Sequence, residues 1–284
     1  MERVPDQASD FVFTNADFNR IRRLIQEHAG IALGDAKRQL AYGRLSRRLR
    51  ALGLQRFDTY LDKLESGEID EWQEFVNALT TNLTSFFREA HHFPILAEYL
   101  VRAGTRRPQR IWCTAASTGE EPYTLAMTAM EAFNTVRPPV EIIATDIDTK
   151  VLAQASAGVY TMEVVSKLEP ARLRRFFLKG KGSSDGMARV RPELQALIEF
   201  RPLNLLAPRY DVTGPFDVIF CRNVMIYFDK PTQRAILEKF VPLLAPGGLL
   251  FCGHSENFTQ ARDLFQLDAK TVYRLPSTRS VKAA

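Results

Sequence analysis

The chain of 284 residues carries a net charge of +5 and is 45% hydrophobic, an ordinary composition for a folded globular protein with one large or two modest domains. No apolar run approaches the roughly 20 residues that cross a membrane, and residues 1–6 lack the layout of a signal peptide. We therefore expect a cytoplasmic protein with no membrane-inserted segment.

Residues 1–88 are predicted to form a small all-helical domain. Thr14 followed by Asp17 resembles a capping box, and apolar residues at helical spacing then run to Gly30. We expect Asp35 to cap a second helix, residues 35–52, which ends at Gly53. Two further helical patterns cover residues 57–64 and 69–79.

The positive charge of this domain is concentrated on its second helix. Between residues 37 and 50 there is no acid, but there are six basic residues: Lys37, Arg38, Arg44, Arg47, Arg48 and Arg50. Such a helix suits an acidic partner, and an ordinary solvated surface is the alternative.

From about residue 108, short apolar runs alternate with helical stretches, which is typical of an α/β fold. Buried parallel strands are predicted at residues 110–113, 140–144, 216–221 and 249–252, with helices at 122–133 and 231–244. We therefore predict a doubly wound sheet in a domain of residues 89–284. Residues 158–201 break this rhythm. A short helical pattern near residues 170–177 and a glycine-rich stretch at residues 180–186 precede the alternating runs 187–191 and 198–200, and this predicts an inserted antiparallel β-subdomain.

The turn after the first strand, residues 114–119, is small-residue rich and leads into Glu120, Glu121 and a proline. Ligands of doubly wound folds bind at such turns. There is no GxGxxG and no P-loop lysine, and the two acids suit a positively charged ligand better than a pyrophosphate. The alternative is that both acids only complement the helix dipole.

Polar residues follow two more strands. Asp146 ends the second strand and is placed to bind ribose hydroxyls, while Asp148 is the better helix cap. Arg222 and Asn223 follow a third strand, so we expect three strand ends to converge. The three cysteines and four histidines lack metal-site spacing, and we predict reduced core thiols and no metal.

Four runs in this order closely resemble the chemotaxis receptor methyltransferase (CheR) family: residues 80–89, 115–123, 145–148 and 220–228. The resemblance extends from about Phe18 to Tyr273. It implies a Rossmann-like S-adenosylmethionine-dependent methyltransferase domain with a small inserted antiparallel β-subdomain, preceded by an all-helical domain.

The resemblance also implies the site residues. Arg88 and Tyr227 would face the reacting methyl group. Contacts to the cofactor, with S-adenosylhomocysteine as its product, would fall on Asn82, Thr84, Arg88, Ala115, Glu121, Asp146, Asn204, Leu205, Arg222 and Asn223.

The implied substrate is a glutamate on the cytoplasmic domain of a chemoreceptor. A carboxylate is already a nucleophile at neutral pH, so no general base is expected, and His254 is interpreted as structural. The basic helix, through Lys37, Arg44, Arg47 and Arg48, would dock the acidic methylation helices. The turn at Gly180 and Gly182 resembles the version of the β-subdomain that binds a C-terminal receptor peptide. We expect a monomer.

Two other functions remain open at this point. A nucleic-acid methyltransferase would share the fold and use the basic helix for phosphates, although residues 221–227 do not resemble the Asn-Pro-Pro-aromatic sequence of amino-group methylation. A non-catalytic receptor adaptor would have kept the fold without the cofactor, which the intact set of acids and Arg88 disfavours. A dinucleotide oxidoreductase is a more distant alternative because the glycines and phosphate site are missing.

Overall fold

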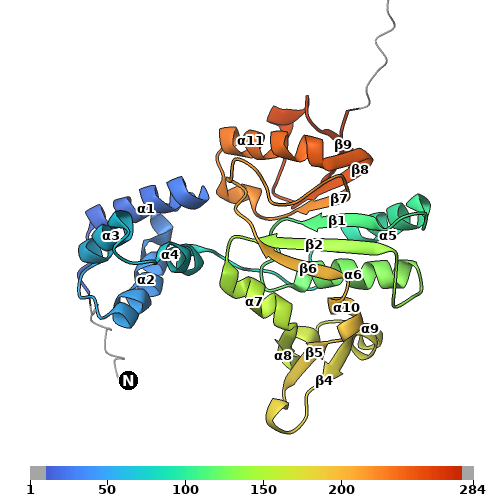
Figure 1. The fold of residues 1–284 in the computed structure, drawn as a ribbon, viewed down its shortest axis with the longest axis horizontal. Coiled ribbons are helices and arrows are strands. Elements are labelled where there is room, and N and C mark those ends of the chain that lie inside the picture. The colour runs from blue at the N-terminus through green and yellow to red at the C-terminus, as the bar shows by residue number, and fades with distance from the viewer. Residues whose placement is uncertain (1–10, 277–284) are drawn as a thin grey trace, which may run out of the picture. The chain divides into compact units, whose positions relative to one another are not determined.

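A computed structural model describes residues 11–276 of the chain (Figure 1). The chain divides into two compact units, one up to Thr81 and one from Asn82. The boundary lies earlier than the one predicted at residue 88, because the segment from Asn82 to Glu89 forms hydrogen bonds with the strand ends of the second unit. Within residues 11–276, no helix is long and apolar enough to cross a membrane.

Within residues 11–81 the first unit contains four α-helices, as the helical patterns predict: α1 (Asn15–Ala29), α2 (Arg38–Leu52), α3 (Phe57–Ser66) and α4 (Trp72–Leu79). Thr14 and Asp17 form the predicted capping box, and Gly30 and Gly53 end their helices in the left-handed conformation. The cap predicted at Asp35 is wrong. Asp35 lies in a 3-10 turn, Asp35–Lys37, and pairs with Arg22 at 2.9 Å.

The second unit is built on a seven-stranded sheet of order β6-β2-β1-β7-β8-β10-β9. Five neighbouring strands run parallel: β6 (Ile198–Pro202), β2 (Val140–Asp146), β1 (Gln109–Cys113), β7 (Phe216–Cys221) and β8 (Leu244–Cys252). Antiparallel β10 (Val272–Arg274) and β9 (Gln266–Ala269) complete one edge.

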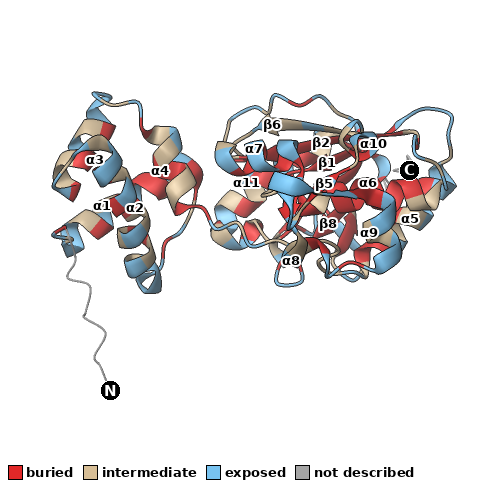
Figure 2. Ribbon diagram, turned by 90° about the horizontal axis from the view of Figure 1, so that it is seen from below, coloured by how far each residue is buried: buried red, intermediate tan, exposed pale blue. Residues whose placement is uncertain are grey.

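Helices cover both faces of this sheet. One core joins α5 (His92–Ala103) and α6 (Glu120–Ala132) to alternate strand residues such as Ile111 and Phe220. The other joins α11 (Lys230–Phe240) to their neighbours, such as Trp112 and Ile219. Figure 2 shows the buried residues concentrated in the strands and in α6. The predicted doubly wound fold is confirmed.

A small antiparallel sheet of order β3-β5-β4 interrupts the second unit after α7 (Thr149–Ala157). It consists of β3 (Val159–Thr161), β5 (Met187–Val190) and β4 (Phe177–Lys179), with the short helices α8 (Met162–Val165), α9 (Pro170–Phe176) and α10 (Pro192–Gln195). Residues 198–200 were expected in this sheet, and that placement is wrong. They belong to β6, where Ile198 pairs with Ile142 of β2. Apolar and polar residues alternate in an edge strand with one exposed face as they do in a hairpin strand. The sequence pattern therefore does not distinguish an edge strand of the large sheet from a strand of the small one.

Candidate active site

The sheet brings the predicted strand-end residues to one level. Cys113 of β1 is in register with Ala144 of β2 and with Phe220 of β7. Two residues further along each strand stand Ala115, Asp146 and Arg222. In a parallel sheet these positions share the carboxyl edge, where doubly wound folds bind their ligands. The predicted convergence of three strand ends is therefore present in the fold.

Asp146 is a buried carboxylate at this edge. Its two oxygens accept hydrogen bonds from the backbone N–H of Ser117 (2.8 Å) and of Asp148 (2.9 Å). Burial raises the pKa of Asp146 to about 6, although both N–H groups oppose the shift. Each oxygen keeps further lone pairs, so the carboxylate can still accept hydrogen bonds from the hydroxyl groups of a ligand.

Asp148 caps α7, as its position after β2 predicts. Its Oδ1 accepts from the backbone N–H of Lys150 (3.0 Å) and Val151 (3.2 Å), and its Oδ2 accepts from Asn82 Nδ2 (2.9 Å). The carbonyl of Asn82 in turn accepts from Ser117 Oγ at 3.3 Å. Asn82 therefore lies against both loops that follow β1 and β2.

Arg222 lies at the centre of a buried ion cluster, and its side chain is 1% exposed. Its guanidinium meets Glu121 Oε2 at 2.8 Å and Glu89 Oε2 at 3.5 Å, and it also donates to the carbonyl of Arg88. Burial raises the pKa of Glu121, and the charge of Arg222 opposes that shift. Arg222 thus joins the end of β7 to the start of α6 and to the segment before α5.

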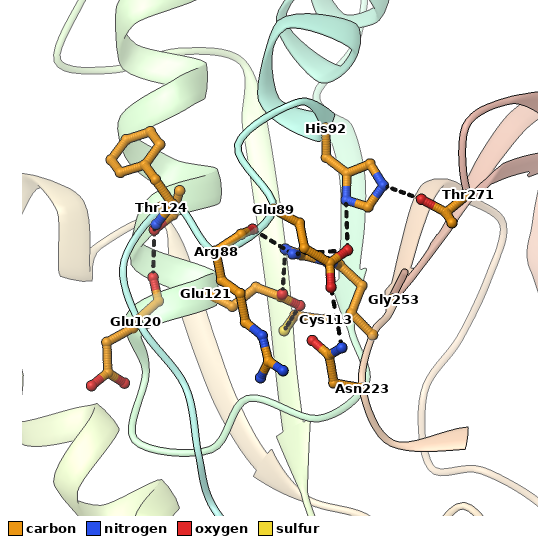
Figure 3. A network of polar contacts seen from close by, with 12 residues as sticks. Arg88, Glu89, His92, Cys113, Glu120, Glu121, Thr124, Asn223, Gly253 and Thr271 are labelled. Carbon is orange, nitrogen blue, oxygen red and sulfur yellow. Dashed lines mark hydrogen bonds and ion pairs between the residues drawn. The ribbon is translucent and has the colours of Figure 1, made fainter. Parts of the chain in front are cut away.

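Glu89 belongs to this cluster although sequence reasoning assigned it no role there; it ends one of the resembling runs, residues 80–89. Its carboxylate accepts from Asn223 Nδ2 at 3.2 Å (Figure 3). It also accepts from the backbone N–H of His254 at 3.2 Å, and His254 Nδ1 lies at 3.1 Å. Burial alone would raise the pKa of Glu89, but these bonds and the charge of Arg222 lower it to about 2. Glu89 therefore fastens the segment of residues 82–89 to the sheet edge.

Several backbones at this edge are strained. Phe87, Glu89, Ser117 and Asn223 have φ of 52°, 55°, 49° and 58°, and they are four of the six non-glycine residues with positive φ within residues 11–276. Such conformations are costly for residues with a Cβ and cluster at functional sites. Their concentration here is an independent indication of function.

Arg88 and Tyr227 come from the two segments that meet at the ion cluster, residues 82–89 and the loop after β7. Arg88 Nη1 donates to the carbonyl of Leu83 at 2.7 Å, and its side chain extends away from Glu89 (Figure 3). Burial raises the pKa of Tyr227, and the positive charge of Arg88 acts against this shift. Both side chains are partly exposed.

The remaining predicted cofactor residues lie around the same edge. Thr84 and Ala115 are partly exposed. Asp146 is in register with Pro202 at the end of β6, so Asn204 and Leu205 follow the same sheet edge. Asn204 Oδ1 accepts from the backbone N–H of Leu206 at 2.9 Å, whereas the Leu205 side chain is buried.

A group of possible metal ligands, Glu89, His91 and His92, also lies here. His92 Nε2 contacts Thr271 Oγ1 at 2.8 Å, and burial together with the charge of Arg222 lowers the pKa of His92 to about 3. A divalent cation would meet the Arg222 guanidinium, which lies 3.5 Å from Glu89. We therefore interpret the group as a hydrogen-bonding cluster.

The basic helix α2 is less available than its sequence suggests. Arg48 forms ion pairs with Glu71 (2.6 Å) and Glu74 (3.3 Å), and Arg44 donates to the carbonyls of Ala78 and Thr80. These partners lie at the two ends of α4 and on it, so the absence of acids within residues 37–50 did not reveal them. Lys37 and Arg47 are exposed.

The two glycines of the inserted subdomain have local structural reasons. A Cβ on Gly180 would lie 2.0 Å from the carbonyl oxygen of Ser184, and Gly182 has φ of 60°. Both lie in the connection between β4 and β5. Since β5 is the central strand, β3 and β4 are the outer strands of the small sheet.

Two family models match the chain in succession. The "CheR methyltransferase, all-alpha domain" matches residues 16–80, and the "CheR methyltransferase, SAM binding domain" matches residues 82–274. The chain belongs to the CheR methyltransferase family. The family resemblance stated from the sequence is confirmed, and S-adenosylmethionine is the cofactor of this fold.

Relatives named chemotaxis protein methyltransferase match nearly the whole chain. That of Escherichia coli K12 is 54% identical over 263 residues, which cover 92% of this chain and 91% of the relative. That of Klebsiella aerogenes is 55% identical over 275 residues, 96% of this chain and 93% of the relative. Chemotaxis protein methyltransferase 2 of Pseudomonas aeruginosa PAO1 is 52% identical over 265 residues, 93% and 94% of the two chains.

The strand-end residues fit the CheR cofactor. Asp146 is a buried carboxylate whose bonds go to backbone N–H groups, which suits hydroxyl donors of a ribose. The turn of residues 114–119 carries small side chains that let a ligand approach the backbone. The chain is accordingly an S-adenosylmethionine-dependent methyltransferase of the CheR family.

Proposed function

We propose that this enzyme transfers a methyl group from S-adenosylmethionine to glutamate side chains of bacterial chemoreceptors, and that Arg88 and Tyr227 act at the reacting centre. The observation that carries the proposal is the place of these two residues at the carboxyl edge of a CheR-family sheet: Arg222 donates to the carbonyl of Arg88, and Tyr227 ends the 3-10 turn that follows Asn223. The product is a glutamyl methyl ester used in chemotactic adaptation.

The proposed reaction needs no general acid or general base. S-adenosylmethionine, when bound, supplies an electrophilic methyl group. The side-chain carboxyl of a substrate glutamate has an unperturbed pKa of about 4.3, so it is already an anion at neutral pH. The partly exposed Arg88 guanidinium would orient this carboxylate, and Tyr227 would pack beside it and donate a hydrogen bond. The ion cluster of Glu89, Glu121 and Arg222 would hold both residues in place.

Asp146 should give cofactor binding a pH dependence. Burial raises the pKa of Asp146 to about 6, so its carboxyl is protonated below that pH and loses acceptor capacity. Affinity for S-adenosylhomocysteine should therefore be constant from pH 7 to pH 8 and fall by up to about tenfold per unit below pH 6. Calorimetry across pH 5–8 checks this. Asp146→Asn should bind weakly at every pH, and a flat wild-type profile would count against the ribose role.

The exposed charges at Lys37, just before α2, and Arg47, on α2, are proposed to attract the acidic methylation helices. Lys37→Glu with Arg47→Glu should slow receptor methylation several-fold at low salt and converge with the wild type at high salt, because screened surface charges act mainly on association. S-adenosylhomocysteine affinity should not change. The control is Arg106→Glu with Arg262→Glu, which alters the net charge equally at other exposed positions. Equal slowing by both pairs would refute a specific docking role.

Arg44 and Arg48 are retained in the proposed receptor-binding set, but they are poor probes of it. Arg48→Glu would leave the buried Glu71 facing another acid, so loss of activity could not be separated from unfolding of the first unit. The pair Lys37 and Arg47 avoids this difficulty.

We also propose that the small sheet binds a C-terminal receptor peptide as an added strand, and that the enzyme is a cytoplasmic monomer. The position of β3 and β4 as the outer strands of the three-stranded sheet supports this mode of binding. Binding of the peptide should survive loss of the catalytic residues, because the two sites lie on different sheets.

Transfer of labelled methyl groups to receptor cytoplasmic domains tests the proposed function. A domain whose target glutamates are replaced by alanine should accept no label. A steep log-log salt dependence of binding to DNA or RNA, with labelling of the nucleic acid, would instead favour a nucleic-acid methyltransferase.

A further inference from the structure

The loop that follows β7, residues 222–227, is held in place by the buried carboxylate of a residue outside it. Glu256, shortly after β8, is 5% exposed. Its Oε2 accepts hydrogen bonds from the backbone N–H of Asn223 (3.1 Å) and of Gly253, and its Oε1 accepts from Met225 (2.8 Å). One side chain thus satisfies backbone donors from the ends of two neighbouring strands.

The loop around Glu256 has the geometry of an anion-binding nest. Asn223 is left-handed, with φ of 58°, and Val224 follows in a right-handed conformation, with φ of −120° and ψ of −33°. This alternation turns successive N–H groups towards one point. Within the part of the chain that the structure describes, Glu256 forms no ion pair, so backbone dipoles alone compensate its charge.

We infer that Glu256 is a positioning residue for methyl transfer: its anionic carboxylate fixes residues 222–227 in the shape that directs Asn223 to Glu89 and places Tyr227 at the end of the 3-10 turn that follows. The inference rests on the proposed function, which places Asn223 and Tyr227 at the reacting site. Asn223 and Glu256 are also linked through Gly253, whose Cβ position would lie 2.4 Å from Asn223 Nδ2. The close packing against Gly253 therefore leaves residues 222–227 no room to shift towards β8.

The charge of Glu256, and not only its volume, is required by this geometry. A glutamine would offer one oxygen and one NH2 group, and the NH2 group would point at backbone N–H donors that it cannot satisfy. Aspartate would keep the charge on a shorter side chain, so it could reach one of the two segments but not both. Alanine would leave the N–H groups without an acceptor beside a small space.

The test combines three variants with separate measurements of binding, catalysis and stability. In Glu256→Gln, kcat for a receptor cytoplasmic domain should fall by about 10- to 100-fold, with the KM for the receptor within about threefold, because the reacting groups are displaced rather than removed. Glu256→Asp should be intermediate. In Glu256→Ala, added formate should restore part of the rate, while chloride at equal ionic strength should not.

The outcomes separate this inference from the proposed function. A folded Glu256→Gln with wild-type kcat overturns the inference, and so does formate that raises the unfolding midpoint of Glu256→Ala without raising its rate. If Glu256→Ala does not fold, the nearly isosteric Glu256→Gln decides alone. Tyr227→Phe tests the proposed site independently. Full activity in Tyr227→Phe counts against the proposed role of Tyr227. If Tyr227→Phe loses activity while Glu256→Gln keeps the wild-type kcat, only the inference about Glu256 is overturned.

Discussion

Arg222→Ala is expected to lower the free energy of unfolding of the second unit by about 3–5 kcal/mol, because it leaves Glu121 and Glu89 as buried carboxylates without a cation. The two tryptophans allow this to be measured for one unit. Trp112 is buried in the sheet of the second unit and Trp72 lies in α4 of the first, so Trp112 fluorescence in a Trp72→Phe background reports urea unfolding of the second unit.

Two controls define what the Arg222 result means. Arg234 forms an exposed ion pair with Asp263, and Arg234→Ala should leave the unfolding midpoint nearly unchanged because solvent screens that pair. Adding Glu121→Gln to Arg222→Ala should recover part of the lost stability, since one uncompensated charge is removed. If Arg222→Ala costs less than about 1 kcal/mol, the cluster does not hold the site together as described.

Arg88→Ala is expected to reduce kcat/KM for receptor methylation by about 100-fold, since it removes the cation that orients the substrate carboxylate. The stability of the protein should change little, because Arg88 is partly exposed and its side chain bonds to the carbonyl of Leu83. Steady-state methylation with a receptor domain measures the first effect, and the unfolding midpoint measures the second.

Matched variants show which property of Arg88 matters. Arg88→Lys should recover part of the rate, because it keeps the charge without the planar fork. Calorimetry with S-adenosylhomocysteine separates the cofactor role from the substrate role of the same side chain. An Arg88→Ala enzyme with wild-type kcat/KM would remove Arg88 from the reacting centre.

Features with a local chemical signal could be predicted from the sequence. The capping box of Thr14 and Asp17 and the stop glycines Gly30 and Gly53 each act within a few residues, and all three lie where expected. Asp148 is likewise a local cap. The strand ends at Asp146 and Arg222 could be placed at one edge because parallel strands present their carboxyl ends together.

Features that depend on long-range pairing could not be predicted. The alternation of residues 198–200 fits a hairpin and an edge strand equally, and only pairing with β2 decides between them. Nothing in the sequence around Arg48 indicates that its partner is Glu71, the residue before α4. Glu89 and Glu256 make most of their bonds to residues far along the chain, and Glu256 bonds largely to backbone N–H groups, which every sequence contains.

The most direct measurement follows a tritiated methyl group from S-adenosylmethionine into a receptor cytoplasmic domain and then exposes the labelled protein to mild base. The account predicts that wild-type enzyme labels the receptor, that mild base releases the label as methanol, and that Arg88→Ala labels it far more slowly. Label that resists mild base, or that appears only on nucleic acid, would contradict glutamate esterification by this site.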